Sequence, residues 1–123
     1  MKGILLYGHG ARNPEWAQPF HRIRDAIKAR APGALVEPGF LELMRPTFDE
    51  GVACLVDQGA TRIVGVPIFM AAGSHVKKDL PRLAADAMDR HAGLAIELAA
   101  PVGEADSVLA AMADYAIGAQ LAD

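Results

Sequence analysis

Short apolar runs alternate with longer helix-like segments along this chain of 123 residues, and this alternation limits the fold more than any other feature. The apolar runs cover 3–7, 35–43, 62–69 and 94–98 and are typical of strands buried on both faces. Helices are expected over about 13–31, 46–58, 79–91 and 104–121. The resulting β-α-β-α-β-α-β-α order predicts a single α/β domain over residues 1–123, with a mostly parallel sheet and right-handed crossovers.

Pro38 and Gly39 interrupt the second apolar run and therefore favour an edge position for that strand. If the first and third strands are neighbours, the four-stranded sheet has the flavodoxin-like order 2-1-3-4, with helices on both faces. Sheets of this kind bind ligands beyond the carboxyl ends of their strands. The chain there is expected to contain a loop over 70–76.

Composition and charge argue against several classes of partner. With 12 Lys and Arg against 15 Asp and Glu, the net charge is −3, which gives no reason to expect nucleic acid or an anionic membrane as partner. No apolar run approaches the ~18–20 residues of a membrane span, so a cytoplasmic protein is expected. The one cysteine, Cys54, excludes an intrachain disulfide and is expected to be a small buried residue in a helix.

Two of the four histidines follow strands at the carboxyl edge. His9 lies between Gly8 and Gly10 after the first strand, and His75 lies in the glycine-bearing turn after the third. Two neutral imidazoles facing one crevice suit a borderline divalent metal such as Co²⁺, Fe²⁺, Ni²⁺ or Zn²⁺, and an imidazole is a common proton acceptor near neutral pH. Alternatively, each histidine only caps a helix or bonds a backbone carbonyl. His21 and His91 are expected to be structural.

Charged side chains also gather after the strands. Together with helix amino termini, five basic residues are expected to make an anion-attracting rim there: Arg12, Arg45, Lys77, Lys78 and Arg82. Alternatively, they are only a solvated face, and this applies to Lys77 and Lys78 above all. Arg45, between Met44 and Pro46, is the one most expected to contact a ligand. Glu42 is expected late in the second strand, where it acts as a proton acceptor, as a partner of a histidine, or only as a polar residue at the sheet end.

Common nucleotide and hydrolase motifs do not fit. Gly8 and Gly10 begin a dinucleotide fingerprint, but Asn13 occupies the place of its third glycine and would obstruct close helix–strand packing. The chain holds no G-x-x-x-x-G-K-[ST] phosphate loop and no G-x-S-x-G nucleophile turn.

Three ordered motifs resemble those of the small CbiX/SirB-type sirohydrochlorin chelatases. Residues 5–14 (LLYGHGARNP) are similar to that family's HGSR-x-P, residues 39–47 (GFLELMRPT) to FLE-x-x-x-PT, and residues 66–81 (VPIFMAAGSHVKKDLP) to P-x-F-L-x-x-G-x-H-x-x-x-D-I-P. The similarity covers about residues 2–85 in order and spacing. Ala11 departs from the pattern, because the family commonly has serine there, and the hydroxyl beside His9 is thereby lost.

The resemblance implies a chelatase-like fold and a lyase that inserts Co²⁺ or Fe²⁺ into sirohydrochlorin without ATP, in cobalamin or siroheme biosynthesis. The metal, for which Ni²⁺ is a third candidate, is a substrate, and no organic cofactor is implied. The resemblance implies that His9 and His75 bind the metal and carry out catalysis. Substrate contacts are implied for Arg45, Met70, Ala71, Ala72, Gly73, Ser74 and His75, with Gly10, Arg12 and Glu42 as supporting residues.

A homodimer is also implied, because the larger members of that family contain two such units. The sequence adds an observation of its own: between Val108 and Ile117 only Asp114 is charged, so the last helix is apolar nearly all round. Two other functions stay open. The first is a non-catalytic carrier of metal or tetrapyrrole with the same fold. The second is a small metal-independent hydrolase that uses His9 as its base.

Overall fold

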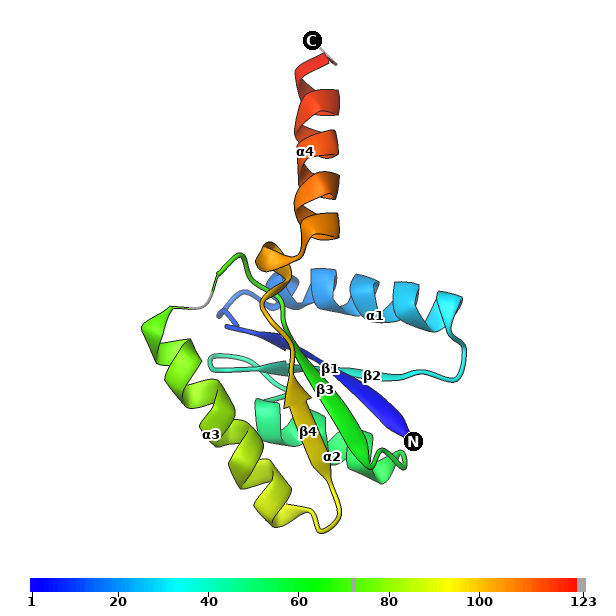
Figure 1. The fold of residues 1–123 in the computed structure, drawn as a ribbon, viewed down its shortest axis with the longest axis vertical. Helices are drawn as coiled ribbons and strands as arrows, with labels where there is room; N and C mark the ends of the chain where they lie inside the picture. The colour runs from blue at the N-terminus through cyan, green and yellow to red at the C-terminus, as the bar shows by residue number, and fades with distance from the viewer. Residues whose placement is uncertain (72, 122–123) are drawn as a thin grey trace.

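A four-stranded parallel sheet of order β2-β1-β3-β4 lies at the centre of the computed structural model (Figure 1). The structure describes residues 1–71 and 73–121, apart from the side chains of His75 and Leu121. The strands are β1 (Lys2–Gly8), β2 (Leu35–Phe40), β3 (Arg62–Pro67) and β4 (Ala95–Leu98). The predicted order is confirmed, and Pro38 lies on an edge strand, paired with Leu6 of β1.

Helices cover both faces of this sheet, as predicted. On one face α1 (Gln18–Arg30) packs Phe20 against Leu6 and Val36. On the other face the apolar sides of α2 (Phe48–Asp57) and α3 (Ser74–Arg90) enclose a larger core with side chains of β1, β3 and β4. Two short 3-10 segments, η1 (Pro14–Ala17) and η2 (Val102–Glu104), precede α1 and the last helix, α4 (Asp106–Leu121).

The second strand ends earlier than the predicted 35–43. β2 ends at Phe40, whose N–H donates to the Pro46 carbonyl, 2.8 Å away, across the loop before α2, although the next two N–H groups still donate to the chain after β1. Leu43 reverses the chain with a φ of 68°. Glu42 therefore lies in an exposed loop, and its expected place late in the strand is wrong.

The third helix begins five residues before the predicted start at 79. Its N-cap is Gly73, which has an extended conformation. Ser74, His75 and Val76 are therefore helical, and the predicted loop over 70–76 ends before them. Pro81, which suggested a first turn, lies inside the helix instead. Cys54 is a further correction, because it lies on the exposed side of α2, with its Sγ 3.5 Å from a carboxylate oxygen of Glu37.

The last helix leaves the body of the molecule. In Figure 1, α4 points away from the sheet, and the element that it mainly contacts is η2. Residues 109–120 are all exposed, including the large side chains Leu109, Met112, Tyr115 and Ile117. No helix in the described ranges is long and apolar enough to cross a membrane.

The close approach of α2 to β2 depends on Gly51. A Cβ at this position would lie 2.6 Å from the carbonyl oxygen of Pro38 and 2.6 Å from a methyl group of Leu5. We expect Gly51→Ala to lower the free energy of unfolding by about 1–3 kcal/mol, because the backbone of β2 must move. Urea denaturation measures the change. Gly33→Ala is the matched control, since nothing lies within 4 Å of its added Cβ, and a loss as large as that of Gly51→Ala would contradict this account.

Candidate functional site at the carboxyl ends of β1 and β3

Backbone hydrogen bonds hold His9 beyond the end of β1. The Leu41 N–H donates to the Gly8 carbonyl at 2.9 Å, and the Glu42 N–H donates to the His9 carbonyl at 3.1 Å. Gly10 completes this turn with a φ of 88°, and a Cβ there would collide with the Glu42 carbonyl. The His9 backbone is therefore fixed against the loop after β2, while its side chain is exposed.

The His9 ring lies against an aromatic row that continues into the core. Its centroid is 4.9 Å from that of Phe69, with 36° between the ring planes. Phe69 in turn meets Tyr7 edge-on at 6.2 Å, and Tyr7 meets Phe48 edge-on at 5.7 Å. Phe69 thus supports the imidazole of an exposed side chain, which remains available to a ligand or a proton.

Tyr7 lies directly beneath this position but is not suited to act as the base. The side chain is 1% exposed, and its hydroxyl has no hydrogen-bond partner among the described residues. Burial, reinforced by the negative charges of Asp79 and Glu42, raises the pKa of Tyr7 to about 12. The phenol consequently stays protonated at neutral pH.

The loop after β3 is held at its base by η2. The Gly103 N–H donates to the Phe69 carbonyl at 3.2 Å, and a Cβ on Gly103 would collide with the backbone of Met70. Met70 itself is 56% exposed. The expected substrate residues Ala71, Gly73 and Ser74 follow as an exposed stretch that runs into the first turn of α3.

His75 occupies the second position of α3, but its side chain lies outside the described residues, as does all of Ala72. Its expected role beside His9 is therefore not tested by the geometry. Within the described side chains, no three His, Cys, Asp or Glu residues gather to hold a metal.

Arg45 is turned toward α2. Its Nε donates to Glu50 Oε1 at 3.1 Å, and its Nη2 contacts the other carboxylate oxygen. The same carboxylate accepts the Thr47 N–H at 2.9 Å, and the Thr47 hydroxyl accepts the Glu50 N–H at 3.2 Å, which completes a capping box at the start of α2. The Arg45 guanidinium remains largely exposed and orders the loop that carries it.

The remaining charged candidates are exposed and spread along the same edge. Arg12, Lys77 and Lys78 lie at the surface, and Arg82 forms an ion pair with Asp79 at 3.3 Å. The side chain of Glu42 is also exposed. Its backbone N–H, and not its carboxylate, is the group that contacts His9.

Two residues of this edge were missed from the sequence. Phe69, predicted to end the third strand and included in the third motif but given no role, supports His9. Leu43, predicted to end the second strand, is 56% exposed on the loop after β2. In the sequence, Leu43 lies close to the charged residues Glu42 and Arg45, and these neighbours indicated an exposed loop. With Met70, Leu43 gives this edge apolar surface as well as charge.

A family comparison matches nearly the whole chain: the family model CbiX covers residues 3–117. The sirohydrochlorin cobaltochelatase of Methanocaldococcus jannaschii is 36% identical over 91 residues, which are 74% of this chain and 64% of that protein. The chain thus spans less than two thirds of the length of this curated relative.

Two solved structures share the fold. A putative cobalamin biosynthesis CbiX protein from Marinobacter aquaeolei VT8 superposes with a TM-score of 0.85 and 27% identity, over 100% of both chains. The sirohydrochlorin chelatase SirB from Bacillus subtilis subspecies spizizenii, in complex with cobalt, gives a TM-score of 0.72 and 34% identity, over 82% of this chain and 43% of that one.

The capping box yields a prediction about pH. Hydrogen bonds from Arg45 and from the Thr47 backbone lower the pKa of Glu50 from 4.5 to about 2. A lowered pKa means that the ionised group stabilises the fold above its unfolded pKa, and that this contribution disappears as the pH falls through about 2. Glu50→Gln should therefore unfold at a lower temperature than the wild type at pH 6, with a difference that shrinks toward pH 2.

Thermal unfolding at several pH values, followed by circular dichroism, measures this difference. Glu15→Gln serves as the control, because Glu15 is an exposed acid that makes no ion pair within the described residues. A Glu50→Gln difference that stays constant down to pH 2 would show that the carboxylate charge is not the stabilising group.

Proposed function

This chain belongs to the CbiX family, and from that premise we propose that it inserts a divalent metal into sirohydrochlorin without ATP, as a lyase. One observation carries the proposal: the exposed imidazole of His9 is supported by Phe69 at the carboxyl edge, beside a loop and a helix amino terminus. The related cobaltochelatase of M. jannaschii supports the choice of substrate. Residues 1–123 act as one chelatase domain in this proposal.

Metal insertion replaces two N–H protons of the macrocycle with one M²⁺ ion, and no electron is transferred. The His9 imidazole, paired with His75, holds the metal before transfer. Once the metal has left, it accepts the two released protons one after the other, and each passes on to water. Imidazole suits both tasks, because it binds borderline metals and is half protonated near neutral pH. The phenol of Tyr7, with its raised pKa, takes no proton in this scheme.

Charge and apolar surface on the same edge suit a flat, carboxylate-rich macrocycle. Arg45 and the free N–H groups at the start of α3 attract its carboxylates. Met70, Ala71, Gly73, Ser74 and Leu43 offer exposed surface to the ring, and the proposal counts Ala72 among the substrate contacts as well. Gly10, Arg12 and Glu42 border His9. Ala11 leaves the position beside His9 without a hydroxyl.

Cobalt is the proposed metal, and Fe²⁺ and Ni²⁺ are alternatives that a histidine site also accepts. The cobalt complex of the SirB relative supports this choice. The metal enters and leaves as substrate, so no resident metal or organic cofactor is required. We further propose that two copies form a homodimer, on the basis of the exposed apolar helix α4.

Substitution of either site histidine should remove catalysis. We expect His9→Ala and His75→Ala to slow Co²⁺ insertion into sirohydrochlorin by about 10²–10⁴-fold, the usual contribution of a positioned acid–base group. His91→Ala is the control, because His91 is the C-cap of α3, at the opposite end of that helix from Gly73 and the carboxyl edge. The absorbance change of the macrocycle measures the rate with and without protein.

The same assay separates the alternatives. A spectral shift on binding, with no acceleration over the reaction without protein, would replace the chelatase by a carrier. Ester hydrolysis without metal that is lost in His9→Ala and kept in His75→Ala would indicate the hydrolase. Either outcome would contradict the proposed reaction.

Arg45 should act on substrate binding more than on the chemical step. We expect Arg45→Gln to raise the KM for sirohydrochlorin about tenfold, since loss of a charge-assisted contact costs on the order of 1.5 kcal/mol, with kcat little changed. Arg24→Gln is the control, because Arg24 also pairs with a neighbouring acid, Asp25 at 3.2 Å, but on α1. Steady-state kinetics at two salt concentrations measure both constants, and an unchanged KM would remove Arg45 from the substrate site.

A further inference from the structure

The hydroxyl of Tyr7 is a buried polar group that the proposed reaction does not use. Tyr7 is 1% exposed, and within the described residues its hydroxyl oxygen has no hydrogen-bond partner. A buried hydroxyl that has lost water without gaining a partner destabilises the folded chain, and such groups are rare in native structures. A hydroxyl kept at this cost beneath His9 calls for a partner from the elements around the site.

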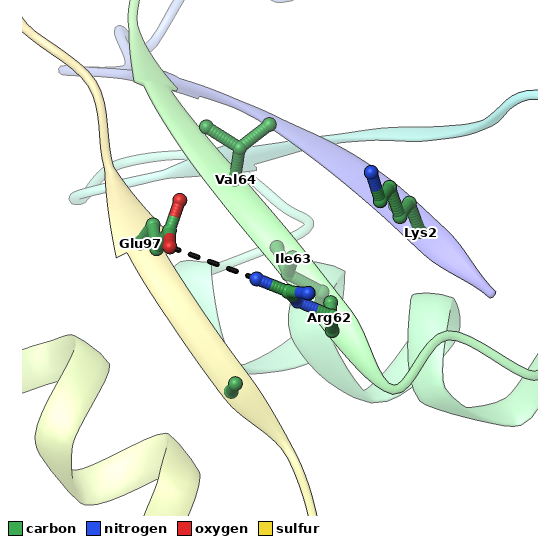
Figure 2. A pocket seen from close by; sticks show the side chains of 7 residues that line it. Lys2, Arg62, Ile63, Val64 and Glu97 are labelled. Atoms are coloured by element: carbon green, nitrogen blue, oxygen red, sulfur yellow. Dashed lines mark ion pairs between the residues drawn. The ribbon is translucent and has the colours of Figure 1, made fainter.

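Tyr7 points into the larger of the two cores, beneath α2 and α3. Side chains alternate between the two faces of a strand. On β3, Val64 borders a trough on the opposite face of the sheet, which Figure 2 shows, whereas the side chain of its neighbour Ile63 belongs to the core that holds Tyr7. The same core contains Val76 and Leu80 from the first two turns of α3. The phenol therefore lies between β1 and the start of α3.

One carboxylate of α3, that of Asp79, lies on the flank of the helix that faces this phenol. Arg90 follows Asp79 by eleven residues, or about three turns, so the two residues share one flank of α3. That flank faces α2, because the Arg90 Nη1 lies 2.8 Å from the Oδ2 of Asp49. The neighbour of Asp49 on α2, Phe48, meets Tyr7 edge-on. Asp79 is thus directed toward the helix against which the Tyr7 ring packs.

The charge of Asp79 already acts on Tyr7. Burial is the main cause of the raised pKa of Tyr7, and Asp79 is the next cause, ahead of Glu42. In the structure the carboxylate of Asp79 lies 3.3 Å from Arg82, in an ion pair whose arginine is 69% exposed. Exposed pairs of this kind contribute little to stability. Asp79 can therefore exchange this contact for a hydrogen bond from a buried hydroxyl that lacks one.

We propose that Tyr7 and Asp79 form a positioning pair for the two site histidines. Tyr7 lies two residues before His9, and Asp79 lies four residues, about one turn, after His75. When the metal binds, the Tyr7 hydroxyl donates to the Asp79 carboxylate, and this bond holds the first turns of α3 against the end of β1. Neither residue touches the metal. The pair rests on the proposed function, since it takes both histidines as metal ligands.

The pair makes the unpartnered hydroxyl part of the metal affinity. A ligand shifts a conformational equilibrium only by binding one arrangement more tightly than the other. A metal held by the turn after β1 and by the first turn of α3 favours the arrangement that brings these elements together, which is also the arrangement that satisfies the hydroxyl. By linkage, the hydrogen bond that forms on metal binding strengthens that binding by the same free energy.

Tyr7→Phe removes the hydroxyl, keeps the ring and tests the pair directly. We expect the affinity for Co²⁺, measured by isothermal titration calorimetry without sirohydrochlorin, and the kcat of insertion each to fall about 10–100-fold, the usual effect of a residue that orients a metal ligand. The KM for sirohydrochlorin should not change. The metal-free variant should unfold at the same temperature as the wild type or at a higher one, because an unpartnered hydroxyl has been removed.

Asp79→Ala should reproduce the losses in Co²⁺ affinity and in kcat. The double variant Tyr7→Phe/Asp79→Ala should lose no more than Asp79→Ala alone, because both substitutions remove one and the same bond. Asp86→Ala is the matched control, since Asp86 is an exposed acid on the same helix, about two turns farther from Gly73 and the carboxyl edge. It should leave both quantities unchanged.

The other outcomes overturn the pair or the proposed function, and they can be told apart. Wild-type Co²⁺ affinity and kcat in Tyr7→Phe would overturn the pair, as would losses that add in the double variant. A lower unfolding temperature of metal-free Tyr7→Phe would also overturn it, because the hydroxyl would then have a partner before the metal arrives. If the wild type binds Co²⁺ without accelerating insertion, the proposed reaction fails and the affinities still decide on the pair. A wild type that binds no Co²⁺ would overturn both.

Discussion

The candidate site depends on backbone pairing that continues past the last residues of the sheet. Two hydrogen bonds join the turn around His9 to the loop after β2, at a point where the strands themselves have ended. They form only because Gly10 has no Cβ to strike the Glu42 carbonyl and can adopt a positive φ. A loop that carries an exposed histidine is thereby as well positioned as a strand, and the proposed metal transfer and proton transfer both require such positioning.

Much of the architecture was predictable because it follows from burial. The apolar runs identify the strands, and Pro38, which cannot donate to a ladder, places its strand at an edge. The boundaries were less predictable, because they depend on single contacts. Soon after β2 the chain turns at Leu43 with a positive φ, and no pattern of hydrophobicity encodes that turn. Proline at 81 suggested a helix start, whereas the cap lies at Gly73.

The sequence predicted which end of the sheet carries the candidate site, but it predicted the contacts within that site only in part. A histidine after a buried strand marks the right end of the sheet, but its support by Phe69 depends on how β3 leaves the sheet. The case of Arg45 differs, since Thr47 and Glu50 have the spacing of a capping box in the sequence itself. That signal indicates that a carboxylate is available to the arginine, and the resulting pair orders the loop before any ligand binds.

The short segment η2 connects two parts of the molecule. On one side Gly103 packs against Met70 and its N–H bonds the Phe69 carbonyl, so η2 touches the loop beside His9. On the other side η2 is the body to which α4 is attached. The direction in which α4 leaves the domain and the position of the loop beside His9 therefore depend on the same few packed backbone atoms.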